Sequence, residues 1–111
     1  MGDEGELFTV GLWTVKSGNE EEFVKKWQAF ARWSLDAMEG GSWAYLLQDA
    51  EQKNRFISFG PWDSLETIAA WRNKPEFKSA IAEFRDLCEE VTPGTMKEVA
   101  HLTIPSAPAP R

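Results

Sequence analysis

The chain has one cysteine and one histidine among its 111 residues. Because Cys88 stands alone, no disulfide can form within the chain, and no cluster of several cysteines can hold a metal. No apolar run approaches the roughly 18 residues that a membrane-spanning helix needs. The opening residues, MGDEGE, are acidic where a secretory signal peptide is basic. We therefore expect a cytoplasmic protein with no membrane span and no metal site.

Several functional signatures are also missing. The sequence contains no GxGxxG, no HExxH, no GxSxG and no GxxxxGK followed by Ser or Thr. It therefore signals no nucleotide-binding loop, zincin site or hydrolase nucleophile elbow. Lys and Arg number 12 against 18 Asp and Glu, which gives a formal net charge of -6. A negative surface repels phosphate backbones, so we expect no nucleic-acid partner.

Aromatic residues, in contrast, are abundant. The chain has six tryptophans, and 42% of its residues are hydrophobic, which is enough to form a core. A length of 111 residues suits a single domain. We expect this domain to occupy residues 1–104. The proline-rich end of the chain, 105–111, is typical of a flexible tail.

Four segments have the composition of β-strands. The first, 6–15, is apolar on both of its faces. The segments 42–49 and 54–60 are separated by a polar stretch and predict an antiparallel hairpin. A last strand is expected at 95–104.

Helical spacing of apolar residues predicts three helical segments. Asn19 can cap the first, and the EGG sequence at 39–41 ends it. Asp63 or Ser64 caps a short second helix, which breaks at 73–75. The TPG sequence at 92–94 closes the last helix. This helix is predicted from apolar residues that follow one another at intervals of 4, 3, 4 and 3: Phe77, Ile81, Phe84, Cys88 and Val91.

This order predicts an α+β, ferredoxin-like βαββαβ fold, with a four-stranded antiparallel sheet and helices on one face. The other face of the sheet would then lack a cover. The first strand is apolar on both faces, and Trp43, Tyr45 and Leu47 lie at alternate positions of the second strand, on one face of it. Something outside the chain should therefore cover the face of the sheet that has no helices. A second copy meets this need, and we expect a homodimer through the sheet faces.

The stretch FISFGPWDSLETIAAWRNKPEF resembles the antibiotic biosynthesis monooxygenase domain of the dimeric α+β barrel superfamily. The resemblance covers roughly residues 6 to 103. It rests on a strand ending in an aromatic-Trp step, a capped short helix and a W-x-x-x-P-x-F opening of the last helix. The superfamily includes enzymes that oxygenate aromatic polyketides without metal or flavin, haem-degrading enzymes and members of no known activity.

The resemblance also implies a test for haem degradation. Members of that branch carry an Asn on the first strand, a Trp in the short helix and a His ten residues later. Trp71 fills the second place, but Gly11 and Ile81 stand at the other two. Without the axial imidazole a haem iron has no protein ligand there. The sequence therefore disfavours haem degradation.

In cofactor-free oxygenases of the family, a tryptophan after the third strand and polar side chains near it line the pocket. Trp62 matches this tryptophan, which makes it a catalytic candidate, and Ser58 is a candidate for substrate binding. Trp71 and Arg72 lie where they can frame the pocket mouth, and Arg72 can bind an anion. The alternative is that both tryptophans are core residues and Arg72 is a solvated helix-end cation.

Tyr45 and His101 are the remaining catalytic candidates. His101 can exchange a proton near neutral pH, although a place on the last strand also suits a structural role or an exposed one. Tyr45 can donate to a substrate oxygen or be a half-buried strand aromatic.

The resemblance thus implies a cofactor-independent, monooxygenase-like enzyme acting on an aromatic or polycyclic small molecule. A non-catalytic ligand-binding or structural dimer module of the same fold is the alternative.

Overall fold

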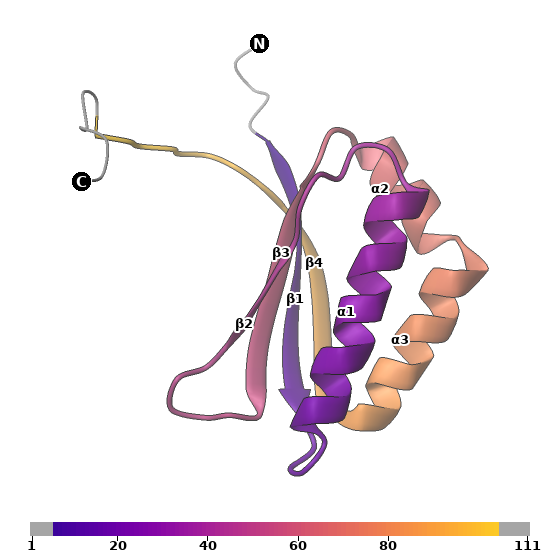
Figure 1. Ribbon diagram of the computed structural model, residues 1–111. Helices are drawn as coiled ribbons and strands as arrows, with labels where there is room; N and C mark the ends of the chain where they lie inside the picture. The colour runs from indigo at the N-terminus through magenta and orange to yellow at the C-terminus, as the bar shows by residue number, and fades with distance from the viewer. Residues whose placement is uncertain (1–5, 105–111) are drawn as a thin grey trace.

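The structure is a computed structural model that describes residues 6–104; the expected tail at 105–111 lies outside the described residues. Seven elements follow one another along the chain (Figure 1): β1 (Leu7–Val15), α1 (Glu20–Ala37), β2 (Tyr45–Gln48), β3 (Arg55–Trp62), α2 (Leu65–Arg72), α3 (Pro75–Leu87) and β4 (Cys88–Lys97).

The four strands form one antiparallel sheet in the order β2-β3-β1-β4. The helices all lie on the same side of this sheet, and the opposite side is uncovered in the chain (Figure 1). The predicted ferredoxin-like α+β fold is therefore confirmed.

Side chains of β1 alternate between the two faces of the sheet. Trp13 and Val15 point toward the helices and are buried, whereas Leu12 is 48% exposed on the opposite side. We call the side without helices the bare face. Its large apolar side chains are shared among all four strands and the segment before β2: Phe8, Val10, Leu12, Trp43, Tyr45, Leu47, Ile57, Phe59 and Met96.

Two groups of buried residues hold the helices on the sheet. The larger group surrounds Phe23 and Phe84, whose ring centroids are 5.6 Å apart. The smaller group joins Trp62 at the end of β3 to Ile68 and Trp71 on α2. The short α2 is thus fixed to the sheet by two tryptophans.

Local sequence signals explain where two of the three helices begin. The Ser64 hydroxyl accepts a hydrogen bond from the Thr67 amide at 3.0 Å, which makes Ser64 the N-cap of α2. Asn19 occupies the N-cap position of α1, but its side chain makes no capping hydrogen bond. Pro75 begins α3, where its missing N–H costs nothing.

The prediction for the end of the last helix was wrong. The helical spacing extends through Cys88 and Val91, yet α3 ends at Leu87 and β4 begins at Cys88. The reason is tertiary, since Cys88 pairs with Val15 and Val91 pairs with Trp13 of β1. Pro93, expected in a turn that closes the helix, lies inside β4, where an edge strand tolerates it.

Two strand boundaries also differ from expectation. The last strand ends at Lys97, so His101 lies outside it, in the segment 98–104 that has no regular secondary structure. Strand β3 continues to Trp62, beyond the predicted end at residue 60, so Pro61 and Trp62 also pair with β1. Gly60 is required there, because a Cβ atom at this position would lie 2.6 Å from the Trp43 carbonyl oxygen.

Within residues 6–104, no helix is long and apolar enough to cross a membrane.

Candidate functional site

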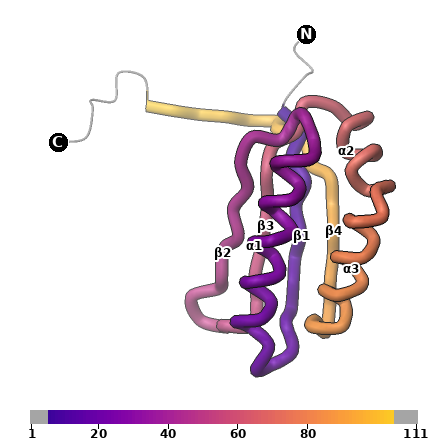
Figure 2. Tube along the Cα trace, turned by 45° about the vertical axis from the view of Figure 1, so that its right-hand side comes forward, coloured from indigo at the N-terminus to yellow at the C-terminus, as the bar shows by residue number. Residues whose placement is uncertain are grey.

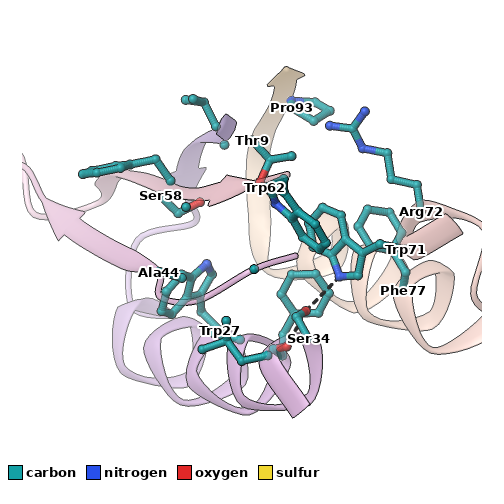
Figure 3. Close-up of a pocket in the computed structure, with 18 of the residues that line it drawn as sticks. Thr9, Trp27, Ser34, Ala44, Ser58, Trp62, Trp71, Arg72, Phe77 and Pro93 are labelled. Atoms are coloured by element: carbon teal, nitrogen blue, oxygen red, sulfur yellow. Dashed lines mark hydrogen bonds between the residues drawn. The ribbon is translucent and has the colours of Figure 1, made fainter. Parts of the chain in front are cut away.

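A cavity of about 90 Å³ lies between the helices and the sheet (Figure 3). Strands β1, β3 and β4, all three helices and the segment that precedes β2 contribute to its wall. The lining is mainly aromatic and aliphatic. Its polar side chains are few: Thr9, Ser34, Ser58 and Arg72, together with indole N–H groups.

The floor of the cavity is a patch of sheet with small side chains. Thr9 pairs with Gly60, and the neighbouring Gly11 pairs with Ser58, so these four residues share the helix-facing side of β1 and β3. The two glycines let neighbouring groups pack directly against the backbone: the Ser58 hydroxyl and the Trp13 indole lie over Gly11, and the Trp43 carbonyl oxygen and Ala44 lie over Gly60. A Cβ atom at Gly11 would lie 2.9 Å from the Ser58 hydroxyl oxygen, so the hydrogen bond between Trp13 and Ser58 fits here only because residue 11 is glycine. We call these four residues the floor.

Tryptophans hold the three hydroxyl groups of the cavity. Each donates its indole N–H to one hydroxyl oxygen: Trp13 to Ser58 at 3.0 Å, Trp62 to Thr9 at 3.0 Å, and Trp71 to Ser34 at 2.9 Å. The last of these bonds is drawn in Figure 3. An indole N–H can only donate, so each hydroxyl acts as an acceptor toward its tryptophan and keeps its own proton for another partner.

The three hydroxyl protons differ in what they can bind. Ser34 donates to the Phe30 carbonyl oxygen at 2.8 Å. Thr9 and Ser58 have no acceptor for their protons in the part of the chain that the structure describes. A ligand oxygen lying on the floor would supply the missing acceptor. The floor therefore offers two hydrogen-bond donors in an apolar surrounding.

Trp62 and Trp71 both line the cavity and pack in the core. They are 7% and 8% exposed, and their ring centroids lie 4.8 Å apart at an interplanar angle of 39°. Phe77 contacts the Trp71 ring edge-on, with centroids 4.7 Å apart. The two alternatives raised by the sequence are thus both met: the tryptophans fill the core on one side and form a cavity wall on the other.

Arg72 lies at the end of α2 and lines the cavity (Figure 3). Among residues 6–104 it has neither an ion pair nor a hydrogen-bond partner. Partial burial lowers the pKa of its guanidinium below its ordinary value, although an arginine remains charged at neutral pH. A cation without a partner is notable in a chain with a net charge of -6. It can bind an anionic group that enters the cavity mouth.

Two catalytic candidates do not reach this cavity. Tyr45 is 58% exposed on the bare face, where its ring contacts Trp43 and Phe59. The His101 side chain is 70% exposed, and its Nδ1 lies 3.4 Å from a Glu98 carboxylate oxygen. Cys88 is also absent from the lining, and burial raises the pKa of its thiol to about 11. None of the three lies beside Trp62.

The three positions of the haem-degrading pattern do come together. Gly11, Trp71 and Ile81 all line the cavity. Neither glycine nor isoleucine has a side chain that can ligate iron, and His101 lies elsewhere. Within the described residues, no group of three or more His, Cys, Asp or Glu side chains is placed to hold a metal ion.

Sequence reasoning missed Thr9 and Ser34 as site residues. Thr9 shares a face of β1 with Trp13, and Ser34 lies in the apolar stripe of α1. A hydroxyl among apolar neighbours on a buried face is the signal that could have identified them. Their partners could not be read from the sequence, because Trp62 and Trp71 lie 53 and 37 residues further along the chain.

Residues 7–83 match the sequence pattern of the family described as antibiotic biosynthesis monooxygenase. No curated protein matches the chain. Similar solved structures include a mutant of SnoaB, a cofactor-independent oxygenase from Streptomyces nogalater, with a TM-score of 0.79 and 19% identity over 88% of this chain and 97% of that one. A conserved protein from Methanosarcina mazei has a TM-score of 0.77 and 15% identity over 85% and 93% of the two chains.

Proposed function

The chain belongs to the antibiotic biosynthesis monooxygenase family, and on this premise we propose that it is a cofactor-independent oxygenase of a flat aromatic small molecule. The observation that carries the proposal is the floor, where the Thr9 and Ser58 hydroxyls each have a proton to donate inside a mainly aromatic cavity. SnoaB, which has a similar fold, is described as a cofactor-independent oxygenase.

The proposed reaction uses dioxygen as the oxidant. A phenolic ketone such as an anthrone loses a proton to give an anion whose charge is shared between its oxygen and the reacting carbon. Thr9 and Ser58 donate hydrogen bonds to that oxygen, and the indoles that hold the two hydroxyls keep both donors oriented. Dioxygen then adds to the carbon; one oxygen atom becomes the new carbonyl, and the other leaves as water.

The residues act by stabilising the substrate anion and excluding water. Among residues 6–104, no carboxylate or imidazole lines the cavity, so these residues offer donors there and no conventional general base. Donors that stabilise the anion lower the pKa of the substrate, which lets a weaker base, such as water at the mouth, take the proton. We assign substrate contacts to Trp62, Trp71 and Ser58.

The size of the cavity limits how a substrate enters. A cavity of about 90 Å³ is smaller than the roughly 150 Å³ hole that accommodates benzene in another protein. A polycyclic substrate therefore requires the mouth to widen. Arg72 lies there without an ion-pair partner among residues 6–104, and we propose that it moves with the substrate and binds an anionic substituent.

The competing function is a non-catalytic module that binds a small ligand. The small cavity and the packing of Trp62 and Trp71 in the core favour it. Both functions predict that an aromatic compound binds at the floor. Only the oxygenase predicts that dioxygen is consumed.

The test combines binding with turnover. Anthrone should quench tryptophan fluorescence in a saturable way, and the protein should speed the formation of anthraquinone and the uptake of oxygen above the spontaneous rate. Ser58→Ala and Trp62→Phe should each lower the rate at least tenfold with the fold intact. Trp33→Phe is the matched control, because Trp33 packs against the smaller core group and does not line the cavity.

The outcomes separate the two functions and also test the proposed substrate class. Saturable binding without oxygen uptake supports the binding module. If the wild-type protein neither binds anthrone nor accelerates its oxidation, the proposed substrate class is wrong.

We also propose that two copies associate through their bare faces. Six large side chains of this face are at least one-third exposed: Leu12, Trp43, Tyr45, Leu47, Ile57 and Met96. An apolar sheet face of this extent is typical of an interface. A face-to-face dimer would cover it without altering the helix side, where the cavity lies.

A further inference from the structure

Four buried tryptophans line the cavity: Trp13, Trp27, Trp62 and Trp71. Three of them donate their indole N–H groups to the cavity hydroxyls, and the exception is Trp27 on α1. Trp27 is 8% exposed, and its indole N–H has no acceptor among residues 6–104. A buried donor without an acceptor costs free energy, so it is uncommon in native structures and calls for an explanation.

The Trp27 ring is directed at the floor from the opposite wall of the cavity. Helix α1 lies on the helix side of the sheet, in front of β3 and β1 in the view of Figure 2. In Figure 3 the Trp27 ring projects from α1 toward the sheet, across the cavity from Ser58, with its nitrogen on the edge that faces the sheet. The N–H group therefore points into the cavity.

The side chains around the cavity leave this N–H without an acceptor of its own. The Ser58 and Thr9 oxygens already accept from Trp13 and Trp62. Ser34, which lies on the same helix as Trp27, accepts from Trp71 and donates to the Phe30 carbonyl oxygen. The other lining residues on α1 are apolar: Phe30, Ala31 and Leu35. A ligand oxygen in the cavity would supply the acceptor.

We propose that Trp27 is a further ligand-binding residue, whose indole N–H donates to an oxygen of the aromatic molecule at the floor. This inference deepens the proposed function, because it rests on an aromatic ligand in the same cavity, but it does not depend on oxidation of that ligand. It assigns the ligand to flat aromatic compounds that carry a carbonyl or phenolate oxygen. An oxygen-free compound of the same shape cannot use the donor.

Trp27 and the floor can donate to one ligand oxygen from opposite sides. Ser58 has a proton to donate from the sheet, and Trp27 has one to donate from α1. A carbonyl oxygen has two lone pairs and can accept both. Because hydrogen bonds to a charged oxygen are stronger than those to a neutral one, Trp27 should favour the anion of anthrone over the neutral compound.

The indole N–H signals of the intact wild-type protein test this contact by nuclear magnetic resonance without any substitution. Anthrone should move the Trp27 proton downfield and slow its exchange with water, because the proton becomes hydrogen-bonded. The comparison compound is 9,10-dihydroanthracene, which has three fused rings and no oxygen, and it should not produce this change. The same response to both compounds, or no response to anthrone, would overturn the proposal.

Trp27→Phe removes the N–H group and keeps an aromatic ring in the core. The affinity for anthrone should fall about fivefold or more, the effect of losing one hydrogen bond, whereas the affinity for 9,10-dihydroanthracene should change less than twofold. Trp33→Phe is the matched control, since Trp33 lies on the same helix but does not line the cavity. Comparing two compounds within one variant cancels a general loosening of the fold. Equal losses for both compounds would make Trp27 a packing residue only.

The ionisation of bound anthrone gives a second measure, read from its absorbance as the pH is changed in the absence of oxygen. Trp27→Phe should raise the pKa of the bound compound, because its anion loses a donor. Trp33→Phe should leave that pKa unchanged. Equal pKa values in the two variants would contradict a contact between Trp27 and the charged oxygen.

The inference and the proposed function fail differently. If the wild-type protein oxidises anthrone and Trp27→Phe binds and oxidises it as Trp33→Phe does, the role of Trp27 is wrong and the oxygenase stands. If Trp27→Phe loses affinity for anthrone alone but the wild-type protein takes up no oxygen, the role of Trp27 stands and the oxygenase is wrong.

Discussion

Gly11 lets the Ser58 hydroxyl and the Trp13 indole pack against the backbone of β1, because it has no Cβ atom. A Cβ atom at this position would lie 2.9 Å from both the Ser58 hydroxyl oxygen and the Trp13 indole nitrogen, the two atoms of one buried hydrogen bond. Such contacts force either the side chains or the strands apart. Residue 11 therefore controls both the hydrogen bond and the volume above it.

We expect Gly11→Ala to destabilise the fold by about 1–3 kcal/mol, as overpacking does in a filled core. It should also reduce the affinity for anthrone more than tenfold, because the added methyl group displaces the Ser58 hydroxyl that donates to the ligand. Urea denaturation measures the first effect, and fluorescence titration measures the second.

Gly94→Ala is the control for this substitution. Gly94 lies on β4, and a Cβ atom there would meet only the flexible end of Met96, at 3.3 Å. It should bind anthrone like the wild-type protein and lose less stability than Gly11→Ala. If both alanine variants bind anthrone normally, the ligand does not lie on the floor.

At the scale of single residues, the sequence predicted which side chains line the cavity better than it predicted their hydrogen-bond partners. Trp62, Trp71, Arg72 and Ser58 all line the cavity. The resemblance pointed to Trp62, but the hydrogen bond from Trp62 to Thr9 depends on how two distant strands pair. Tyr45 and His101 were chosen for chemistry alone, and chemistry does not fix the face of a sheet or the end of a strand.

Among the elements, α2 depends most on local signals. It has eight residues and its apolar contacts are concentrated on Ile68 and Trp71. A helix this short is marginal without tertiary contacts and capping. Its N-cap, Ser64, accepts a hydrogen bond from the Thr67 amide.

We expect Ser64→Ala to destabilise the protein by about 1 kcal/mol, the usual cost of losing an N-cap side chain. Because α2 carries Trp71 and Arg72, the same variant should also weaken anthrone binding. Ser79→Ala is the control: Ser79 is exposed within α3, where alanine is the better helix former, so stability should stay level or rise slightly. Equal losses in the two variants would mean that the cap contributes nothing specific.

The boundary between α3 and β4 shows where local reasoning ends. The spacing of apolar residues continued in helical register through Cys88 and Val91 and gave no sign of a change. Both side chains still contact the larger core group, one buried and one partly buried, but they do so from a strand. Pairing with β1 decides the conformation, and this pairing joins residues more than 70 positions apart.

For the whole molecule, the order of elements was the most informative feature of the sequence. Turn residues and changes of apolar period predicted the βαββαβ order, and a four-stranded sheet with helices on one side follows from it. The uncovered apolar face was also predictable, because β1 has few polar residues on either side. What covers that face is a property of more than one chain, so it stays a prediction.

Leu12 provides the sharpest test of that prediction. It lies on the bare face in β1, an inner strand of the sheet, and is 48% exposed. An aspartate at this position should be tolerated in a folded monomer, because water can still reach the carboxylate. In a face-to-face dimer the same carboxylate would be buried without a partner, which costs several kcal/mol.

We therefore expect Leu12→Asp to remain folded by circular dichroism but to sediment as a monomer at concentrations where the wild-type protein is dimeric. Gln28→Asp adds the same charge on the exposed side of α1, and it should leave the dimer intact. This control separates loss of the interface from general charge repulsion in a chain that already has a net charge of -6. A Leu12→Asp protein that dimerises as tightly as the Gln28→Asp protein would place the contact between copies on another surface, most simply the helix side.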